Sequence, residues 1–255
     1  MSLILHMKVP GVFVIASDCR VTDKKKLYVT VENENVDLEG NKIKRIGKPE
    51  DVKPHEFIEG LTNQVRFGEY EYVVTDTEQK TFLLKAEIGY FAVSYCGSGN
   101  INGYPASYII KQGLKNMTDV NSTYDLAGRF RAYWEEANVD NIPNLLISGY
   151  NDDNMSILEV HSNGNITQHF TGDDSYGIVY NGEKSVAHLL IELGGYHFSL
   201  FRLQEAMDFC KTLIHTTAKI LSLQRKQQTV SEAYDMLLMT KTKAEWVERS
   251  SIDFE

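Results

Sequence analysis

The first twenty residues, MSLILHMKVPGVFVIASDCR, constrain the fold of this chain most strongly. Two apolar runs, 2–8 and 12–18, flank a Pro-Gly pair, and this pattern predicts a β-hairpin. The second run closes on Asp18, with Arg20 two residues further on. Charges at the end of an apolar strand are typical of a structural ion pair. Near the start of a chain they also fit a catalytic use of the N-terminus.

Strand and helix patterns alternate along most of the remaining chain. Two strands are predicted over 80–96, around a turn near 85–87, and further strands over 144–150, 155–161, 166–170 and 233–241. Helices are predicted over 103–115, 122–137, 183–193 and about 200–222. This order predicts an α+β fold of the four-layer α-β-β-α sandwich type, with two sheets face to face and a helix pair on each outer side. We expect one domain over 1–255.

Residues 21–78 depart from this regularity. They form the most polar and least periodic part of the chain, and the run KPEDVKPHEF within them carries two prolines. Long irregular connections run over the surface of a domain. The sequence therefore predicts an inserted surface segment at about 21–78.

Composition limits the classes of partner. A net charge of −9 and a pI of about 5.3 argue against a nucleic-acid binder that relies on phosphate contacts, and against a polybasic membrane anchor. No apolar run reaches the length of a membrane span. The cysteines (Cys19, Cys96, Cys210) and the seven histidines lack metal-ligand spacing, so we predict no metal site and no cofactor. Reduced, widely spaced cysteines indicate a cytoplasmic protein.

Several segments, in the correct order, carry a family resemblance. The Gly149-Tyr150 pair before Asn-Asp-Asp, the strand-turn-strand LEVHSNGNI, the helix LQEAMDFCKTLIHTTA and the strand MLLMTKTKAEWV resemble the corresponding parts of proteasome β-type subunits. These subunits are N-terminal-nucleophile hydrolases. The resemblance covers residues 1–20 and 79–250.

The resemblance implies a set of catalytic groups. In that family the N-terminal residue is the nucleophile and its own amine acts as base. Counting back from Asp18 places the nucleophile on Ser2, exposed by removal of the initiator methionine. Asp18 matches the aspartate that orients a lysine, and Lys80 matches that lysine, with Lys85 as the alternative. Gly97 matches the glycine whose backbone N–H forms the oxyanion hole.

Two further positions match the substrate side of the family's site. Arg20 corresponds to the arginine two residues after the aspartate, and Tyr95 stands two residues before Gly97, at the mouth of the substrate pocket. Two supporting elements differ. The family's supporting serine falls on Glu183, and its Asp-x-x-Ser-Gly-Gly turn is replaced by QQTVSE at 227–232. We therefore expect both supporting elements to be missing.

Three functions follow from the resemblance, and the sequence leaves all three open. The first is a peptidase subunit of an oligomeric ring protease that acts on peptides or unfolded proteins. The second is a catalytically inactive structural or assembly subunit. The third is an amidase on a non-peptide substrate, because one fold hosts many activities. The expected partners are further copies of the chain in a ring, related subunits or an ATPase, with no nucleic acid and no membrane.

Overall fold

The computed structural model describes residues 2–26, 64–67, 70–136, 142–151, 153–170, 174–224 and 229–251. The chain divides into two compact units. One contains the described residues of Met1–Val21 and Thr75–Glu255, and the other those of Thr22–Val74. This division lies close to the limits expected for the inserted segment at 21–78.

The N-terminal hairpin forms the centre of the first sheet. Strand β1 (Leu3–Val9) pairs with β2 (Val12–Asp18) across a turn at Gly11, whose φ of +76° favours glycine. The full antiparallel order is β13-β1-β2-β14-β15. The other strands are β13 (Gly177–Gly182), β14 (Tyr234–Met239) and β15 (Ala244–Glu248). The side chains of β1 are buried along its whole length, as expected for a strand that is covered on both faces.

The second sheet is also antiparallel and has the order β12-β11-β10-β7-β6. Its strands are β6 (Thr81–Ala86), β7 (Gly89–Cys96), β10 (Asn144–Asn151), β11 (Asn154–Val160) and β12 (Ile166–His169). A two-residue pair, β8 (Asn100–Ile101) with β9 (Tyr104–Pro105), follows β7. The second sheet therefore ends in β6 on one side and β12 on the other.

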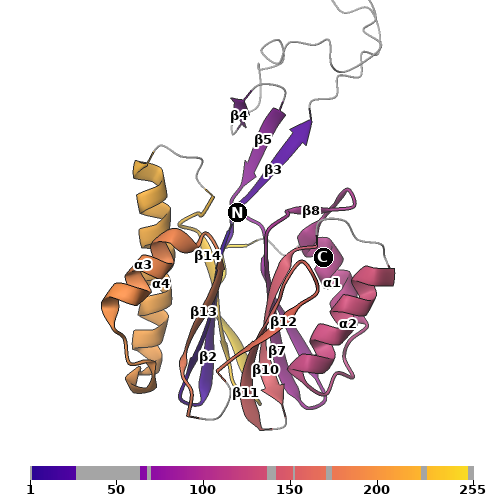
Figure 1. Cartoon of the computed structure of the whole chain (residues 1–255), viewed down its shortest axis with the longest axis vertical. Helices are drawn as coiled ribbons and strands as arrows, with labels where there is room; N and C mark the ends of the chain where they lie inside the picture. The colour runs from indigo at the N-terminus through magenta and orange to yellow at the C-terminus, as the bar shows by residue number, and fades with distance from the viewer. Residues whose placement is uncertain are drawn as a thin grey trace, which may run out of the picture. The chain divides into compact units, whose positions relative to one another are not determined.

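The described helices form two pairs. Helices α1 (Ala106–Lys115) and α2 (Thr123–Glu136) follow β9, and helices α3 (Lys184–Gly194) and α4 (Leu203–Leu223) follow β13. A short 3-10 helix, Phe198–Leu200, lies between α3 and α4. In Figure 1 the α1–α2 pair lies on the outer side of the second sheet and the α3–α4 pair on the outer side of the first.

Three clusters of buried hydrophobic side chains hold these elements together. One joins α1 and α2 to the second sheet and includes Phe91 and Phe130. Another joins α3 and α4 to the first sheet and includes Leu5 and Leu213. The third contains side chains from both sheets, such as Phe13. Each sheet thus buries both faces, which accounts for the nearly continuous apolar runs in its central strands.

The second unit contains a small sheet of order β3-β5-β4. Its strands are β3 (Val21–Lys26), β4 (Gln64–Phe67) and β5 (Tyr70–Thr75), and β4 pairs with β5 in antiparallel register.

The expected α+β class is confirmed, and several element limits need correction. Lys85 lies inside β6, where it pairs with Tyr90, because the turn comes at Glu87 and Ile88. Helix α1 begins at Ala106, after Pro105, whose missing N–H and fixed φ suit a helix start. Strand β15 was not expected at all. None of the described helices is long and apolar enough to cross a membrane.

Candidate active site

A buried ion pair lies where β2 ends and β6 begins. The Lys80 Nζ donates to Asp18 Oδ1 at 2.9 Å, and both side chains are 0% exposed. Asp18 is the last residue of β2, and Lys80 directly precedes β6. Charges this deep in a protein persist only when hydrogen bonds satisfy their remaining groups. The hydrogen-bond partners of each charge therefore show which segments of the chain the pair holds in place.

Three backbone N–H groups surround the Asp18 carboxylate. Leu3 N donates to Oδ1 at 2.7 Å, while Arg20 N and Ser231 N donate to Oδ2 at 3.0 and 3.3 Å. With the lysine, each oxygen has two donors. Through these hydrogen bonds the Asp18 carboxylate links the start of β1, the end of β2, the start of β6 and the residues before β14.

Lys80 uses two of its three ammonium hydrogens in the described part of the chain. One goes to Asp18 and another to the carbonyl oxygen of Arg20. Within the described residues, its ammonium makes no hydrogen bond to the Ser2 hydroxyl. One N–H direction therefore stays available for a group that approaches beside Asp18.

Ser2 is held next to this pair by its backbone. Its neighbour Leu3 donates to Asp18, and its own carbonyl accepts from Glu183 N at 2.6 Å. Gly182 lies so close that a Cβ there would come within 1.8 Å of the Ser2 carbonyl oxygen, and its φ is +96°. Only glycine fits at this position. Ser2 itself is 5% exposed.

Gly97 directly follows the last residue of β7, at the end of that strand nearest Lys80. Tyr95 N donates to the Lys80 carbonyl at 3.1 Å, and Cys96 pairs with Asn144. Gly97 then turns the chain with a φ of +118°. Such a turn leaves backbone N–H groups outside the strand ladder, which is what an oxyanion site needs.

Arg20 and Tyr95 both bind other side chains of the protein. The Arg20 guanidinium forms two hydrogen bonds to Asp76, at 2.5 and 2.6 Å, and this carboxylate raises the pKa of Arg20. The Tyr95 ring stacks on Phe82 in the core, and its hydroxyl donates to Glu78 at 3.2 Å. Their assignment to substrate binding stays a prediction.

No protein-family model matches the chain, and no curated protein matches it in sequence. Solved structures do match in three dimensions. One is a Gly-1 mutant of Anbu from Hyphomicrobium sp. strain MC1, a proteasome-like bacterial protein. The TM-score is 0.58 over 98% of this chain and 89% of that chain, at 10% sequence identity. The fold is proteasome-like.

Within this proteasome-like fold, the turn before β14 takes part in the site, contrary to expectation. Ser231 is buried, its N–H donates to Asp18, and its hydroxyl accepts from Cys19 N at 3.3 Å and donates to the Ala233 carbonyl at 2.7 Å. The turn lacks the family's pattern of residues but still supplies a backbone donor and a serine. Of the run 227–232, residues 227 and 228 lie outside the described part.

A second polar network, which the sequence did not reveal, runs through the interior of the proteasome-like fold. His6 Nδ1 and Nε2 lie 2.6 and 2.7 Å from the hydroxyls of Ser148 and Ser94. Ser94 contacts Thr81 Oγ1 at 2.8 Å, and Thr81 donates to Ser17 Oγ at 2.9 Å. Because Thr81 follows Lys80 and Ser17 precedes Asp18, this chain of hydroxyls reaches the residues beside the ion pair.

Burial decides the charge of this histidine. It lowers the pKa of His6 to about 3, so the imidazole is neutral at physiological pH, with one nitrogen donating and the other accepting. A lone histidine within an apolar strand gives no sequence signal for such a network. Its two hydroxyl partners come from two other strands, β7 and β10.

The cysteines near the site are protonated. Burial raises the pKa of Cys96 to about 12, and burial together with Asp235 raises the pKa of Cys19. A thiol acts as nucleophile only as thiolate, so neither suits that role. Among the described residues, no group of three or more His, Cys, Asp or Glu side chains is placed to hold a metal ion.

Proposed function

We propose that this chain is an N-terminal-nucleophile hydrolase with a four-layer α-β-β-α arrangement, acting on amide bonds in peptides or unfolded proteins. The observation that carries the proposal is the fully buried Asp18–Lys80 pair, whose carboxylate also binds the N–H of Leu3. A buried ion pair usually adds little stability over apolar residues of similar size. Its position beside Ser2 gives it a catalytic use.

In this proposal Ser2 is the first residue of the mature chain. Its hydroxyl oxygen attacks the carbonyl carbon of the substrate, and the hydroxyl proton moves to the free α-amine of the same residue. The Lys80 ammonium stabilises the developing negative charge, and Asp18 holds that ammonium in place. The amine then protonates the leaving nitrogen, and water hydrolyses the acyl-enzyme.

The oxyanion of the tetrahedral intermediate is assigned to the Gly97 N–H. The positive φ of Gly97 and its place at the Lys80 end of the sheet support this assignment. A serine nucleophile is favoured over a thiol because the pKa values of Cys19 and Cys96 are both raised. We also propose that the chain assembles into a ring or another homo-oligomer, which the likeness to Anbu supports. Its widely spaced cysteines, all free in the structure, favour action in the cytoplasm.

The proposal is tested with two forms of the protein. One starts at Ser2, after cleavage from a fusion that leaves no extra residue, and the other keeps the preceding methionine. Mass spectrometry checks each N-terminus. We expect the first form to cleave a panel of fluorogenic peptides, and its Ser2→Ala variant to lose at least about a hundredfold in rate. The second form lacks the base and should be inactive.

The paired variant Asp18→Asn/Lys80→Met removes the ion pair without leaving one charge alone. It should be as inactive as Ser2→Ala while keeping a folded circular-dichroism spectrum. Equal activity of the two N-terminal forms, or activity that survives Ser2→Ala, would sink the assignment of Ser2.

A second candidate is a catalytically inactive structural subunit. It is favoured by the lack of a hydrogen bond between Lys80 and the Ser2 hydroxyl in the described residues. In that case the Asp18 environment serves only to tie four segments together. Absence of turnover in the form that begins at Ser2, with a folded and oligomeric protein, would support this candidate.

A further inference from the structure

Asp235 carries a buried carboxylate that the proposed reaction does not use. It is the second residue of β14, pairs with Ser17 of β2, and is 1% exposed. Its neighbours Tyr234 and Met236 pack toward α3 and α4, so the alternation of a strand turns the Asp235 side chain to the face between the sheets. No lysine, arginine or histidine in the described part of the chain forms an ion pair with it.

The two oxygens of this carboxylate have different surroundings. Oδ1 accepts from the N–H groups of Ser250 and Ser251, at 2.8 and 2.9 Å, and from the Cys19 thiol at 3.6 Å. Oδ2 is buried and accepts no hydrogen bond from the described residues. A buried carboxylate oxygen is costly to leave unsatisfied. Oδ2 therefore lies where a donor or a cation is needed.

The Ser251 hydroxyl is a second buried group without a hydrogen-bond partner among the described residues. The N–H of the same residue binds Asp235 Oδ1, so the hydroxyl belongs to the immediate surroundings of the carboxylate. The hydroxyl and Oδ2 do not bind each other. A small species in contact with both oxygens would satisfy both.

The charge around this place is negative. Burial raises the pKa of the Cys19 thiol, the Asp235 and Asp18 carboxylates raise it further, and Lys80 lowers it. Lys80 is paired with Asp18, so the charge of Asp235 is the one that stays uncompensated. A water molecule would satisfy the hydrogen bonding of Oδ2 but would leave the charge. A cation satisfies both.

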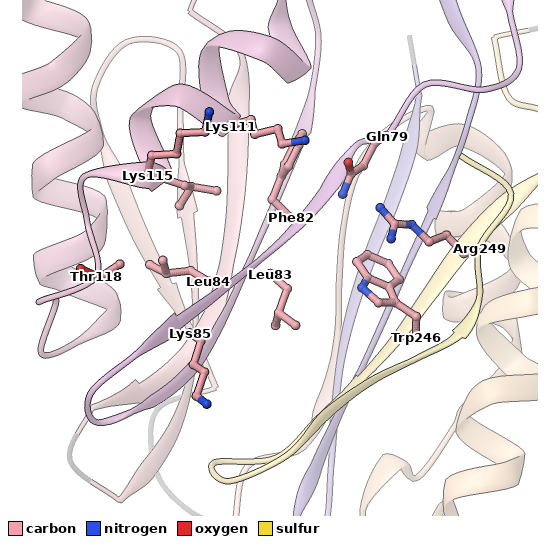
Figure 2. A pocket seen from close by; sticks show the side chains of 11 residues that line it. Gln79, Phe82, Leu83, Leu84, Lys85, Lys111, Lys115, Thr118, Trp246 and Arg249 are labelled. Carbon is pink, nitrogen blue, oxygen red and sulfur yellow. The ribbon is translucent and has the colours of Figure 1, made fainter. Parts of the chain in front are cut away.

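The segment that carries Ser251 is held from the other side by β15. The Arg249 guanidinium lies over the Trp246 ring, 5.2 Å from its centroid. Figure 2 shows these two side chains together at the hollow between β6 and β15. The contact fixes the residue before the two serines, so their N–H groups reach Asp235 from an anchored strand end.

We propose that Asp235 and Ser251 bind a monovalent metal cation, Na⁺ or K⁺, between β14 and the residues that follow β15. Asp235 Oδ2 and Ser251 Oγ are its protein ligands, and water completes the coordination, since hard cations prefer oxygen ligands. One free carboxylate oxygen suits a single charge, whereas Ca²⁺ sites usually combine several carboxylates. The two residues lie 16 positions apart and form no metal-ligand motif, so the sequence did not indicate the site.

The inference does not rest on the proposed hydrolase activity, because its test measures stability and ion position. Urea midpoints of the full chain are compared in NaCl, KCl and choline chloride, each at about 0.2 M so that charge screening is equal. We expect Na⁺ or K⁺ to raise the midpoint with a saturable dose dependence, because the ion binds the folded chain only. Choline is too large for the site and should not.

Three variants locate the effect. Asp235→Asn keeps one acceptor oxygen and puts an NH₂ group in place of Oδ2, so it should fold and lose the response to Na⁺ and K⁺. Ser251→Ala should weaken the apparent affinity for the ion by at least about tenfold. The matched control is Ser250→Ala, the same change in the preceding residue, which should respond like the wild type. Crystals soaked in Rb⁺ should show an anomalous peak in contact with Asp235 Oδ2.

Four results would overturn the proposal. Equal midpoints in all three salts would leave a bound water only. An undiminished response in Asp235→Asn, or in Ser251→Ala if the former fails to fold, would place the ion elsewhere. A larger rise in about 1 mM CaCl₂ than in NaCl or KCl would indicate a divalent site. Absence of the Rb⁺ peak at Asp235 would remove the assigned ligands.

Discussion

His6 places a titratable ring between the two sheets, where every neighbour in hydrogen-bond contact is a hydroxyl. Ser94 and Ser148 bind its two nitrogens and satisfy the neutral ring, whereas burial disfavours a charged ring. At the residue scale this burial makes the stability of the fold depend on pH. The pKa of His6 in the folded protein, about 3, lies far below the ordinary histidine value of 6.5.

The sign of the effect follows from linkage. Below pH 6.5 the unfolded chain binds a proton at residue 6, while the folded chain binds it only near pH 3. The stabilisation is complete above pH 6.5 and is lost as the pH falls toward 3. In this window His6 contributes up to about 1.4 kcal/mol per pH unit to the decrease of the unfolding free energy on acidification. We predict that His6→Gln removes this contribution, so that the unfolding free energy depends less steeply on pH.

Urea titrations between about pH 7 and pH 4 measure both slopes. His197→Gln, at an exposed position, is the matched control and should keep the wild-type slope. Parallel slopes for wild type and His6→Gln would show that His6 does not control acid sensitivity.

At the scale of elements, helix α4 shows how a periodic pattern becomes a layer contact. Its buried residues recur at helical spacing and pack on the first sheet, while the opposite face meets solvent. Leu213 is 1% exposed and Leu223 is 73% exposed on the same helix. Replacing each of these leucines by alanine therefore distinguishes the contribution of packing from that of helix propensity.

We predict that Leu213→Ala lowers the unfolding free energy by about 2–5 kcal/mol, because it leaves a cavity against the sheet. Leu223→Ala should change it by less than about 0.5 kcal/mol. Chemical denaturation measures both. Similar losses in the two variants would mean that α4 is not anchored through the buried face.

The long elements could be predicted from sequence because the pattern of apolar residues shows which of their faces are buried. The four described helices have a dominant period and the central strands are nearly continuous apolar runs, and neighbouring residues alone establish both patterns. Strand β15, AEWVE, was not predictable because its exposed charges hide the strand pattern, and it exists through pairing with β14. The two-residue strands β8 and β9 are too short to show any period.

Only some residues of the candidate site could be expected from the sequence. Asp18 and Lys80 were expected as a pair through the family resemblance, and the structure brings them together. The roles of Ser231 and His6 depend on contacts between residues far apart in sequence, which no local pattern encodes. Tyr95 was placed from its distance to Gly97 alone, and that distance does not say to which side of the sheet the ring turns.

At the scale of the whole molecule, the chain consists of one large α+β unit and one small sheet-containing unit, and the former carries the candidate site. All the groups around Asp18 belong to the large unit but come from distant parts of the sequence. Lys80 lies 62 residues from Asp18, and Ser231 lies 213 residues from it.

Contacts of this separation form late, because the entropy of closing long loops must first be overcome. We predict that Asp18→Asn/Lys80→Met speeds unfolding and leaves the folding rate nearly unchanged. Stopped-flow measurements over a range of urea concentrations separate the two limbs. A slower folding limb with an unchanged unfolding limb would place the pair in the folding nucleus instead.

The number of donors around the Asp18 carboxylate also determines at which stage of folding the candidate site is complete. These donors are complete only after the beginning, the middle and the end of the chain have come together. A half-made chain lacks the Ser231 donor, so the carboxylate beside Ser2 does not yet have its full set of hydrogen bonds. If the Asp18–Lys80 pair serves hydrolysis, the activity appears only with the finished fold, and a growing chain cannot use it on itself or on its neighbours.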